Sequence, residues 1–316
     1  MKKIPLEDID LSDQRFRVSY FFNLDQLSQS IREVGLIYPP VVSQRNDSIV
    51  PVTGWKRIFA CKKLFLSPIP AYLSSETDDL KSFKLALFEN LTTKKFDMIE
   101  RAEIVCRLKK FGESEKNIIR RYLPLFGIPP TYDYYDLYSN ISCLKRKEKS
   151  IVSEKNMALS VVEYLIQFSP KERKILFPIL VFLSQNKQKE LLELTREISL
   201  RTEIPVQEIF DSKEIKNVLL SDNLSSIQKA DRVRFLLKEM RFPLLSSREK
   251  SFDSAKKKLG WPKDIDLSPT PYFEDNQAHI KFSFKGNKDY LKKISNLLSM
   301  SEKDEFSSLL KTILDE

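Results

Sequence analysis

The sequence predicts an α+β N-terminal domain, a mostly α-helical middle region and a small α+β C-terminal unit. Short β-type segments, interrupted by proline and glycine, occur in residues 1–111. Helical spacing of apolar residues then continues almost unbroken through residues 112–241. Alternating apolar residues return within residues 242–316, next to a basic segment that connects the two regions. We therefore expect three domains with these boundaries, a number that suits a chain of 316 residues.

The first elements of the N-terminal domain are predicted by caps and turns. Residues 4–9 form a short apolar and acidic segment, which we expect to be an edge strand. A helix follows, with Asn23 as its N-cap and Gly35 as its stop. Two consecutive prolines then force an extended chain, and an Asn-Asp turn sends it back. Residues 41–44 and 48–52 are therefore predicted to pair as a β-hairpin.

The segment 48–65 combines a short strand, a glycine turn and a basic amphipathic helix. Gly54 interrupts the β-type residues, and helical spacing begins at Trp55. The free N–H groups and the positive dipole end of a helix start attract anions, and Lys56 and Arg57 add cations in the first turn. This pattern predicts a phosphate-binding turn. A solvated basic helix packed by its aromatic residues is the alternative.

Two further helices complete the domain after a small proline-framed strand. Asp78 or its neighbour caps the first helix, which carries Glu89 and Asn90 near its C-terminal end. Asp97 and Glu100 have the spacing of a capping box and begin the second helix. The carboxylate and amide oxygens near the end of the first helix are suited to a magnesium ion beside a triphosphate.

The charge balance favours polyanionic partners. Lysine and arginine number 53 against 44 aspartates and glutamates, a net charge of +9, which makes nucleic acid or an anionic surface the natural partner. The N-terminus reaches acidic residues before any apolar core of a signal peptide, and no apolar run approaches the roughly 18 residues of a membrane helix. We therefore expect a cytoplasmic protein with no membrane partner.

The cysteines and the histidine predict neither a disulfide framework nor a zinc site. Cys61, Cys106 and Cys143 are far apart on expected helix faces and are interpreted as buried thiols. His279, the single histidine, falls in an alternating strand pattern and is expected to face solvent. These residues cannot assemble a zinc site of the usual type or a histidine-based triad, so no catalytic residue is assigned.

The order of these elements closely resembles the N-terminal domain of ParB, the family of chromosome and plasmid partition proteins, over roughly residues 4–111. In that family the domain is a nucleotide switch that binds CTP with magnesium and then closes as a clamp on DNA. The resemblance therefore implies CTP and magnesium as cofactors, DNA as a partner, a homodimer joined at the C-termini and a partition ATPase as a further partner. It also implies a nucleotide site composed of Gly54, Lys56, Arg57, Glu89, Asn90, Arg15 and Arg17, with Glu89 and Asn90 as the metal ligands.

Two motifs depart from the family pattern. The family's Gly-Glu-Arg-Arg stands here with Trp55 and Lys56 at its second and third positions. The family's Glu-Asn-x-x-Arg ends here in Thr93, with only Lys94 and Lys95 nearby as substitutes. A lysine cannot make the bidentate contact of an arginine, so these changes favour nucleotide binding over hydrolysis.

The middle region resembles the helix-turn-helix of the same family. Its second helix is expected over residues 131–147, with Asp133 and Asp136 where base edges would be read, and carboxylates there are repelled by DNA phosphates. Cations occur on both sides of its acidic half. The DNA-binding candidates are Arg120, Arg121, Lys145, Arg146 and Lys147, although such a charge run is more often a solvated helix face.

The C-terminal unit is expected to contain a hairpin turned at Asp275-Asn276, followed by two helices.

Two other functional classes stay open for the whole chain. One is an enzyme of the same superfamily, either a phosphotransferase or a nuclease, or a sulfiredoxin-like protein with Cys61 as the reactive thiol. The other is a degenerate, non-catalytic adaptor.

Overall fold

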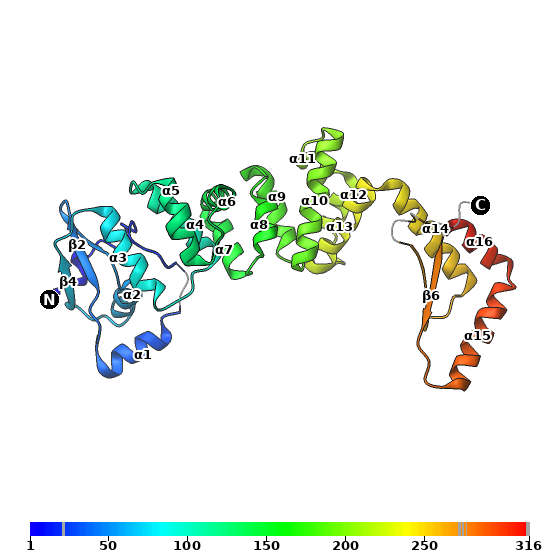
Figure 1. The fold of residues 1–316 in the computed structure, drawn as a ribbon, viewed down its shortest axis with the longest axis horizontal. Helices are drawn as coiled ribbons and strands as arrows, with labels where there is room; N and C mark the ends of the chain where they lie inside the picture. The colour runs from blue at the N-terminus through cyan, green and yellow to red at the C-terminus, as the bar shows by residue number, and fades with distance from the viewer. Residues whose placement is uncertain (21–22, 271–272, 274, 276, 314–316) are drawn as a thin grey trace. The chain divides into compact units, whose positions relative to one another are not determined.

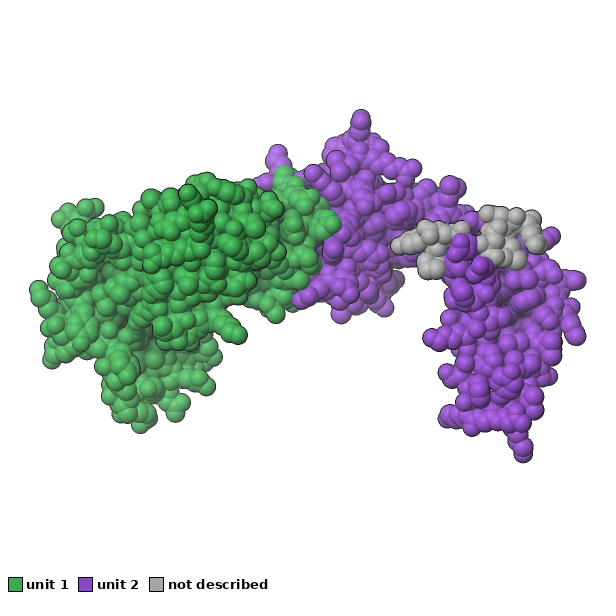
Figure 2. Space-filling view, in the orientation of Figure 1, with its two compact units in different colours: residues 1–169 green, residues 170–316 purple. Residues whose placement is uncertain are grey.

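The chain forms two compact units, residues 1–169 and 170–316 (Figure 2). The structure is a computed structural model that describes residues 1–20, 23–270, 273, 275 and 277–313. Both α+β parts and the long helical region between them are present, which confirms the predicted fold class. The division into three domains at residues 111 and 241 stays a prediction.

The first unit contains a four-stranded sheet followed by helices (Figure 1). The strand order is β1-β4-β2-β3, in which β2 and β4 are parallel and the other two pairs are antiparallel. Short turns of helix lie at η1 (Leu6–Asp8), η2 (Ile118–Tyr122) and η3 (Leu123–Phe126). The strands and helices are β1 (Lys2–Ile4), α1 (Asp25–Val34), β2 (Val41–Arg45), β3 (Ser48–Pro51), α2 (Trp55–Lys63), β4 (Ile69–Ser74), α3 (Asp79–Leu91), α4 (Met98–Lys110), α5 (Glu115–Asn117), α6 (Tyr132–Ser142), α7 (Arg146–Glu154) and α8 (Leu159–Leu165).

The predicted hairpin is confirmed as β2 and β3, in the register that places Val42 opposite Pro51. Helix α2 returns the chain to β4, which joins the sheet beside β2. The core of this α+β part is apolar because the inner faces of α1, α2 and the sheet contribute aliphatic side chains to one cluster. Its buried members are Ile4, Ile9, Ile31, Val42, Ile58, Ala60, Cys61, Ile69 and Ala71.

Two of the N-terminal predictions need correction. Only residues Lys2–Ile4 form the edge strand β1, since the chain turns into η1 at Leu6. Helix α1 begins at Asp25 with Leu24 as its N-cap residue, one residue later than expected. Asn23 still serves the helix start, because its Oδ1 accepts a hydrogen bond of 2.7 Å from the Asp25 N–H. The predicted stop at Gly35 is confirmed.

The predicted caps of α3 and α4 are confirmed. The Asp78 side chain accepts a hydrogen bond from the Lys81 N–H at the start of α3. Asp97 and Glu100 form a reciprocal capping box at the start of α4. These short motifs are reliable because both partners lie within one turn and satisfy N–H groups that the helix itself leaves unpaired.

The helical part of the first unit is built around α4, which packs against α6 and α7. The predicted long second helix is wrong in its extent, because α6 ends at Ser142 and a new helix, α7, begins at Arg146. The Glu148 carboxylate accepts a hydrogen bond of 2.7 Å from the Lys145 N–H, which starts α7 as a separate element. The basic run at Lys145 and Arg146 therefore belongs to the start of α7.

The second unit is a set of helices followed by a small α+β part. Its elements are α9 (Pro170–Leu180), α10 (Gln185–Thr202), α11 (Val206–Asp211), α12 (Lys213–Leu220), α13 (Ser226–Arg241), α14 (Pro243–Leu259), β5 (Ile265–Pro269), β6 (Ala278–Phe282), α15 (Asn287–Ser301) and α16 (Asp304–Ile313). The helical spacing of apolar residues in this region is interrupted at Ser212, whose φ of −56° and ψ of 145° separate α11 from α12. Helices α14 and α16 share a core with β5, in which Trp261 stacks on Phe306.

The C-terminal hairpin pairs β5 with β6, and the expected turn residues fall between the end of β5 at Pro269 and the start of β6 at Ala278. Asn276, half of the expected turn, lies outside the described residues. His279 is exposed on β6, as predicted. Two cysteine predictions are wrong: Cys61 is buried, but Cys106 on α4 and Cys143, the residue after α6, are exposed. Among the described helices, none has the length and apolar composition needed to cross a bilayer.

Candidate functional site

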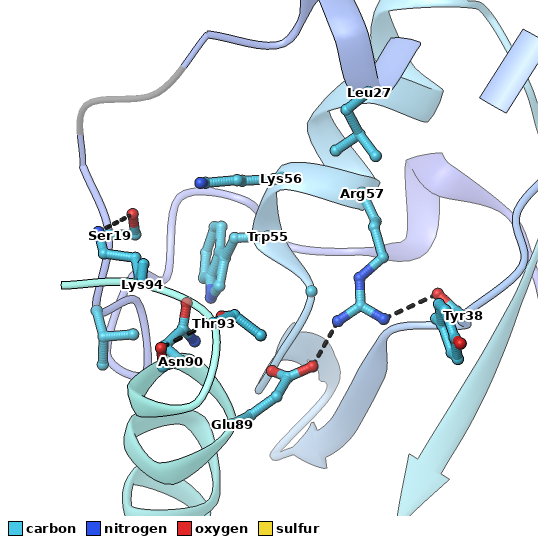
Figure 3. Close-up of a pocket in the computed structure, with 12 residues that line it drawn as sticks. Ser19, Leu27, Tyr38, Trp55, Lys56, Arg57, Glu89, Asn90, Thr93 and Lys94 are labelled. Carbon is cyan, nitrogen blue, oxygen red and sulfur yellow. Dashed lines mark hydrogen bonds and ion pairs between the residues drawn. The ribbon is translucent and has the colours of Figure 1, made fainter. Parts of the chain in front are cut away.

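A pocket of about 420 Å³ lies between the start of α2 and the end of α3 (Figure 3). Five of the seven residues predicted for the nucleotide site line it. They are Gly54, Lys56, Arg57, Glu89 and Asn90. Helix α2, which begins after Gly54, precedes β4, and α3, which carries Glu89 and Asn90, follows it. The parallel pairing of β2 with β4 therefore brings the glycine turn and the Glu-Asn pair together.

Gly54 allows α2 to begin where it does. Its φ of 78° lies in the left-handed region, which a residue with a Cβ adopts only with strain. A Cβ at this position would lie 2.7 Å from Pro40 Cβ and 3.1 Å from Arg57 Cζ. The chain leaving Pro40 and the first turn of α2 therefore approach as closely as a glycine permits. This close approach places the N-terminal end of α2 and its dipole at the pocket.

Arg57 and Glu89 join the two halves of the site directly. Arg57 Nη2 donates a hydrogen bond of 2.5 Å to Glu89 Oε1, and its Nη1 donates one of 2.8 Å to the Tyr38 carbonyl oxygen (Figure 3). The arginine side chain is 20% exposed and that of Glu89 is 37% exposed. The charges that could receive a phosphate and a metal ion thus neutralise each other in this structure.

Asn90 is held with its amide nitrogen turned to the helix. Its Nδ2 donates a hydrogen bond of 2.8 Å to the Ala86 carbonyl oxygen, so the amide oxygen is the atom left for a cation. The Thr93 hydroxyl donates to the Asn90 carbonyl oxygen. The described residues contain no group of three His, Cys, Asp or Glu placed to hold a metal ion. Glu89 and Asn90 fit magnesium only where phosphates and waters complete its shell.

Lys94 lines the pocket but does not stand in for the missing arginine of the second motif. Its Nζ lies 2.5 Å from Glu100 Oε1 and 2.9 Å from Ser19 Oγ. Glu100 is buried and also completes the capping box with Asp97. Lys94 therefore satisfies a carboxylate that has no access to water, and a ligand would gain little from competing for it.

The two N-terminal arginines lie outside this pocket. Arg15 binds Asp13 and Asp79 through ion pairs of 2.7 and 3.0 Å, and it lines a different cavity. Arg17 donates to the Ser19 and Tyr20 carbonyl oxygens. Burial lowers the pKa of Arg17 from its ordinary value, and its carbonyl contacts hold the segment in place. Of the two, Arg17 contacts a residue of the pocket wall, since its guanidinium lies 5.7 Å from the Trp55 ring.

Trp55 lines the pocket, although its position in the sequence indicated only a packing residue and a departure from the family pattern. It is 6% exposed and packs against Phe59, with a centroid separation of 5.9 Å, while the Arg17 guanidinium lies 5.7 Å from its ring. Its indole nitrogen is buried without a hydrogen-bond partner. The arrangement of the aromatic pair at residues i and i+4 was visible in the sequence, but the orientation of the nitrogen was not.

The candidate DNA-binding cations are all exposed on the first unit. They are Arg120, Arg121, Lys145, Arg146 and Lys147. The first two lie in η2 and the others at the start of α7, and both elements pack on α4. Asp133 and Asp136 on α6 are also exposed. Cations from two elements of one unit are therefore available for phosphate, beside a helix whose exposed face is partly acidic.

Cys61 does not have the surroundings of a reactive thiol. It is fully buried in the apolar core of the α+β part and does not line the pocket. Burial raises the pKa of its thiol, whereas a nucleophilic cysteine needs a lowered one. This geometry gives no support to sulfiredoxin-like chemistry.

The geometry of the pocket agrees with the comparison to known families. Residues 1–91 match the family model described as the ParB N-terminal domain. This part of the chain is therefore similar to a ParB N-terminal domain. The match contains Gly54 and its turn as well as Glu89 and Asn90, so both halves of the pocket lie within the matched residues.

Known ParB proteins resemble this chain over different lengths. It is 22% identical to the probable chromosome-partitioning protein ParB of Campylobacter jejuni over 226 residues, which cover 68% of this chain and 79% of that protein. It is 32% identical to the chromosome-partitioning protein Spo0J of Thermus thermophilus over 99 residues, 31% of this chain and 36% of the relative. The higher identity thus spans little more than a third of the Thermus protein.

Two crystal structures of C-terminally truncated ParB from Caulobacter crescentus were also similar. The complex with the centromeric parS site is 18% identical, covers 61% of this chain and 99% of that chain, and has a TM-score of 0.34. The complex with CTP-gamma-S is 20% identical, covers 53% and 92%, and has a TM-score of 0.26. Neither superposition is close enough to transfer a ligand position to this chain.

Proposed function

We propose that this chain is a ParB-type DNA-binding protein of DNA partition or nucleoid organisation, whose N-terminal domain binds a nucleoside triphosphate with magnesium. The observation that carries the proposal is the convergence of Arg57, Glu89 and Asn90 on one pocket at the start of α2. CTP is the first nucleotide to test, because the resemblance to ParB implies it.

The Arg57–Glu89 ion pair suggests how such a ligand is received. Glu89 and Asn90 would hold the metal ion of a magnesium nucleotide, and Arg57 would hold its triphosphate. Arg57 would then exchange the carboxylate for a phosphate oxygen and Glu89 would pair with the cation, so neither charge would be left unpaired. A nucleotide without magnesium would compete with Glu89 for the same guanidinium. We therefore expect binding to depend strongly on magnesium.

Calorimetric titration with CTP tests this proposal, with and without magnesium and with ATP as a comparison. Arg57→Ala should weaken binding by at least about tenfold, since a charge-assisted hydrogen bond is worth about 1.5–3 kcal/mol. Glu89→Gln should remove the dependence on magnesium, while Glu33→Gln, an exposed site on α1, serves as the matched control. Absence of nucleotide binding by the folded wild-type chain would contradict the proposal.

DNA binding rests on the exposed cations of η2 and α7, together with the similarity to chromosome-partitioning proteins. Each phosphate neutralised by a cation contributes a slope of about −0.9 to the dependence of log K on log salt. Replacing Lys145, Arg146 and Lys147 with alanine should therefore flatten the salt slope by up to about three. The control replaces three other exposed cations of the same unit, Lys2, Lys3 and Arg32. Equal slopes for the two triple variants, measured by fluorescence anisotropy, would argue against this surface.

Binding without turnover is the second candidate, in which the chain acts as a non-catalytic adaptor. It is favoured by Thr93 at the position of the family's arginine and by Lys94, which is held by Glu100. Phosphate release measured with CTP, magnesium and DNA separates the two cases, because an active switch releases phosphate and an adaptor does not. The homodimer and the partition ATPase stay proposals by resemblance; light scattering of the full chain tests the first of them.

A further inference from the structure

The indole N–H of Trp55 is a buried donor without an acceptor in the described part of the chain. The residue is 6% exposed, and its Nε1 is buried and unpartnered. The other tryptophan, Trp261, behaves as buried indoles usually do, since its Nε1 donates a hydrogen bond of 2.8 Å to the Ile265 carbonyl oxygen. A buried polar group left unpaired costs about 1–3 kcal/mol, so such an atom in a pocket wall points to a ligand.

The ring is held so that its nitrogen faces the pocket. Phe59 packs beside it and the Arg17 guanidinium lies near its ring, which limits the rotamers open to the side chain. Figure 3 shows the indole nitrogen at the end of the ring that faces Asn90 and Thr93. The Asn90 amide nitrogen is itself a donor, committed to the Ala86 carbonyl oxygen. The donor is thus placed between the start of α2 and the end of α3.

We propose that Trp55 is a phosphate-binding residue, whose indole N–H donates a hydrogen bond to a phosphoryl oxygen of the nucleotide in this pocket. The inference rests on the proposed nucleotide site. Phosphate is the acceptor chemistry that its surroundings favour, because Lys56 and Arg57 line the same pocket at the N-terminal end of α2. An indole N–H at this position can donate directly to a phosphoryl oxygen, which the ionised acidic residue of the family pattern cannot do.

This role also accounts for the departures from the family motifs together. Lys56 replaces an arginine in the first motif, and Thr93 replaces one in the second, so the pocket has lost guanidinium donors. Trp55 adds one N–H donor, on a rigid ring, to the lining of the same pocket. The site then holds phosphate through an indole, a lysine, Arg57 and the start of a helix.

The test uses the full chain labelled with ¹⁵N-tryptophan, which gives two indole N–H signals, one from each tryptophan. Trp55→Phe and Trp261→Phe assign the two signals. The probes are magnesium tripolyphosphate, magnesium CTP and cytidine. We expect the Trp55 proton to shift downfield with tripolyphosphate and CTP and to stay in place with cytidine, while the Trp261 signal stays in place throughout. Trp55→Phe keeps an aromatic ring for packing but removes the N–H donor, so it should weaken CTP binding about tenfold. Trp261→Phe should bind CTP as the wild type does.

Two results would overturn this inference and leave the proposed function standing. One is CTP binding seen by calorimetry with no shift of the Trp55 signal. The other is a shift of that signal with cytidine alone, which would assign the donor to the base. Failure of the wild-type chain to bind either tripolyphosphate or CTP would overturn the inference and the proposed function together. The spectra of the wild type decide the matter even where Trp55→Phe is poorly folded.

Discussion

Replacing Gly54 with alanine should destabilise the first unit far more than the same change at Gly127. Both glycines have a left-handed φ, 78° and 69°, so the backbone cost for a residue with a Cβ is about 1–2 kcal/mol at each. They differ in space. A Cβ at Gly54 would lie 2.7 Å from Pro40 Cβ and 3.0 Å from Pro40 Cα, whereas one at Gly127 would meet nothing within 4 Å.

The overlap with Pro40 adds the steric part of the effect. A proline ring and its backbone cannot turn aside as a flexible side chain can, and overpacking of this kind costs about 1–3 kcal/mol. We therefore expect a loss in the free energy of unfolding of about 3 kcal/mol for Gly54→Ala and about 1 kcal/mol for Gly127→Ala. Gly54→Ala should also impair nucleotide binding, because the new Cβ would lie 3.1 Å from Arg57 Cζ.

Urea unfolding measures the difference. In a Trp261→Phe background the remaining tryptophan, Trp55, reports on the first unit alone, to which both glycines belong. The midpoints and slopes of the two alanine variants are compared with the parent in this background. Equal losses of stability in the two variants would refute the argument that close approach to Pro40 requires a glycine at residue 54.

Three further outcomes are expected. Burial alone would raise the pKa of Glu113, but the hydrogen bond from Lys84 and two other hydrogen bonds lower it to about 2. The ionised carboxylate therefore stabilises the fold at pH values above its ordinary pKa, and this stabilisation is lost as the pH falls towards 2. Glu113→Gln should therefore cost about 2 kcal/mol at pH 7 and almost nothing at pH 2 in urea titrations, and an equal cost at both would contradict the ion pair. Asp97→Ala should lower the free energy of unfolding by about 1–2 kcal/mol in the same assay, since it removes the cap of α4 and the acceptor of the Ser153 hydroxyl. A loss of stability below about 0.5 kcal/mol would count against the cap. Ellman's reagent should modify the exposed thiols of Cys106 and Cys143 immediately in the folded chain, and the thiol of Cys61 only after unfolding. Immediate modification of all three thiols would be inconsistent with the burial of Cys61.

Much of the fold could be predicted because its signals are local. The hairpin, the helix after Gly54 and the capping box of Asp97 each depend on a few neighbouring residues whose backbone preferences agree. The errors occurred where a local signal was weak. A helical apolar spacing lies on both sides of Ser212, and only the packed structure shows that the helix is interrupted there.

The sequence by itself determined the two halves of the candidate site, since the glycine turn and the Glu-Asn pair are short motifs with their own chemistry. Only the tertiary structure decided how the halves meet. It paired Arg57 with Glu89, turned Arg15 to Asp13 and Asp79, and left the Trp55 nitrogen without an acceptor. A hydrogen bond or an ion pair forms only where folding brings two side chains within about 3 Å of each other. The spacing of residues along the chain does not specify that distance.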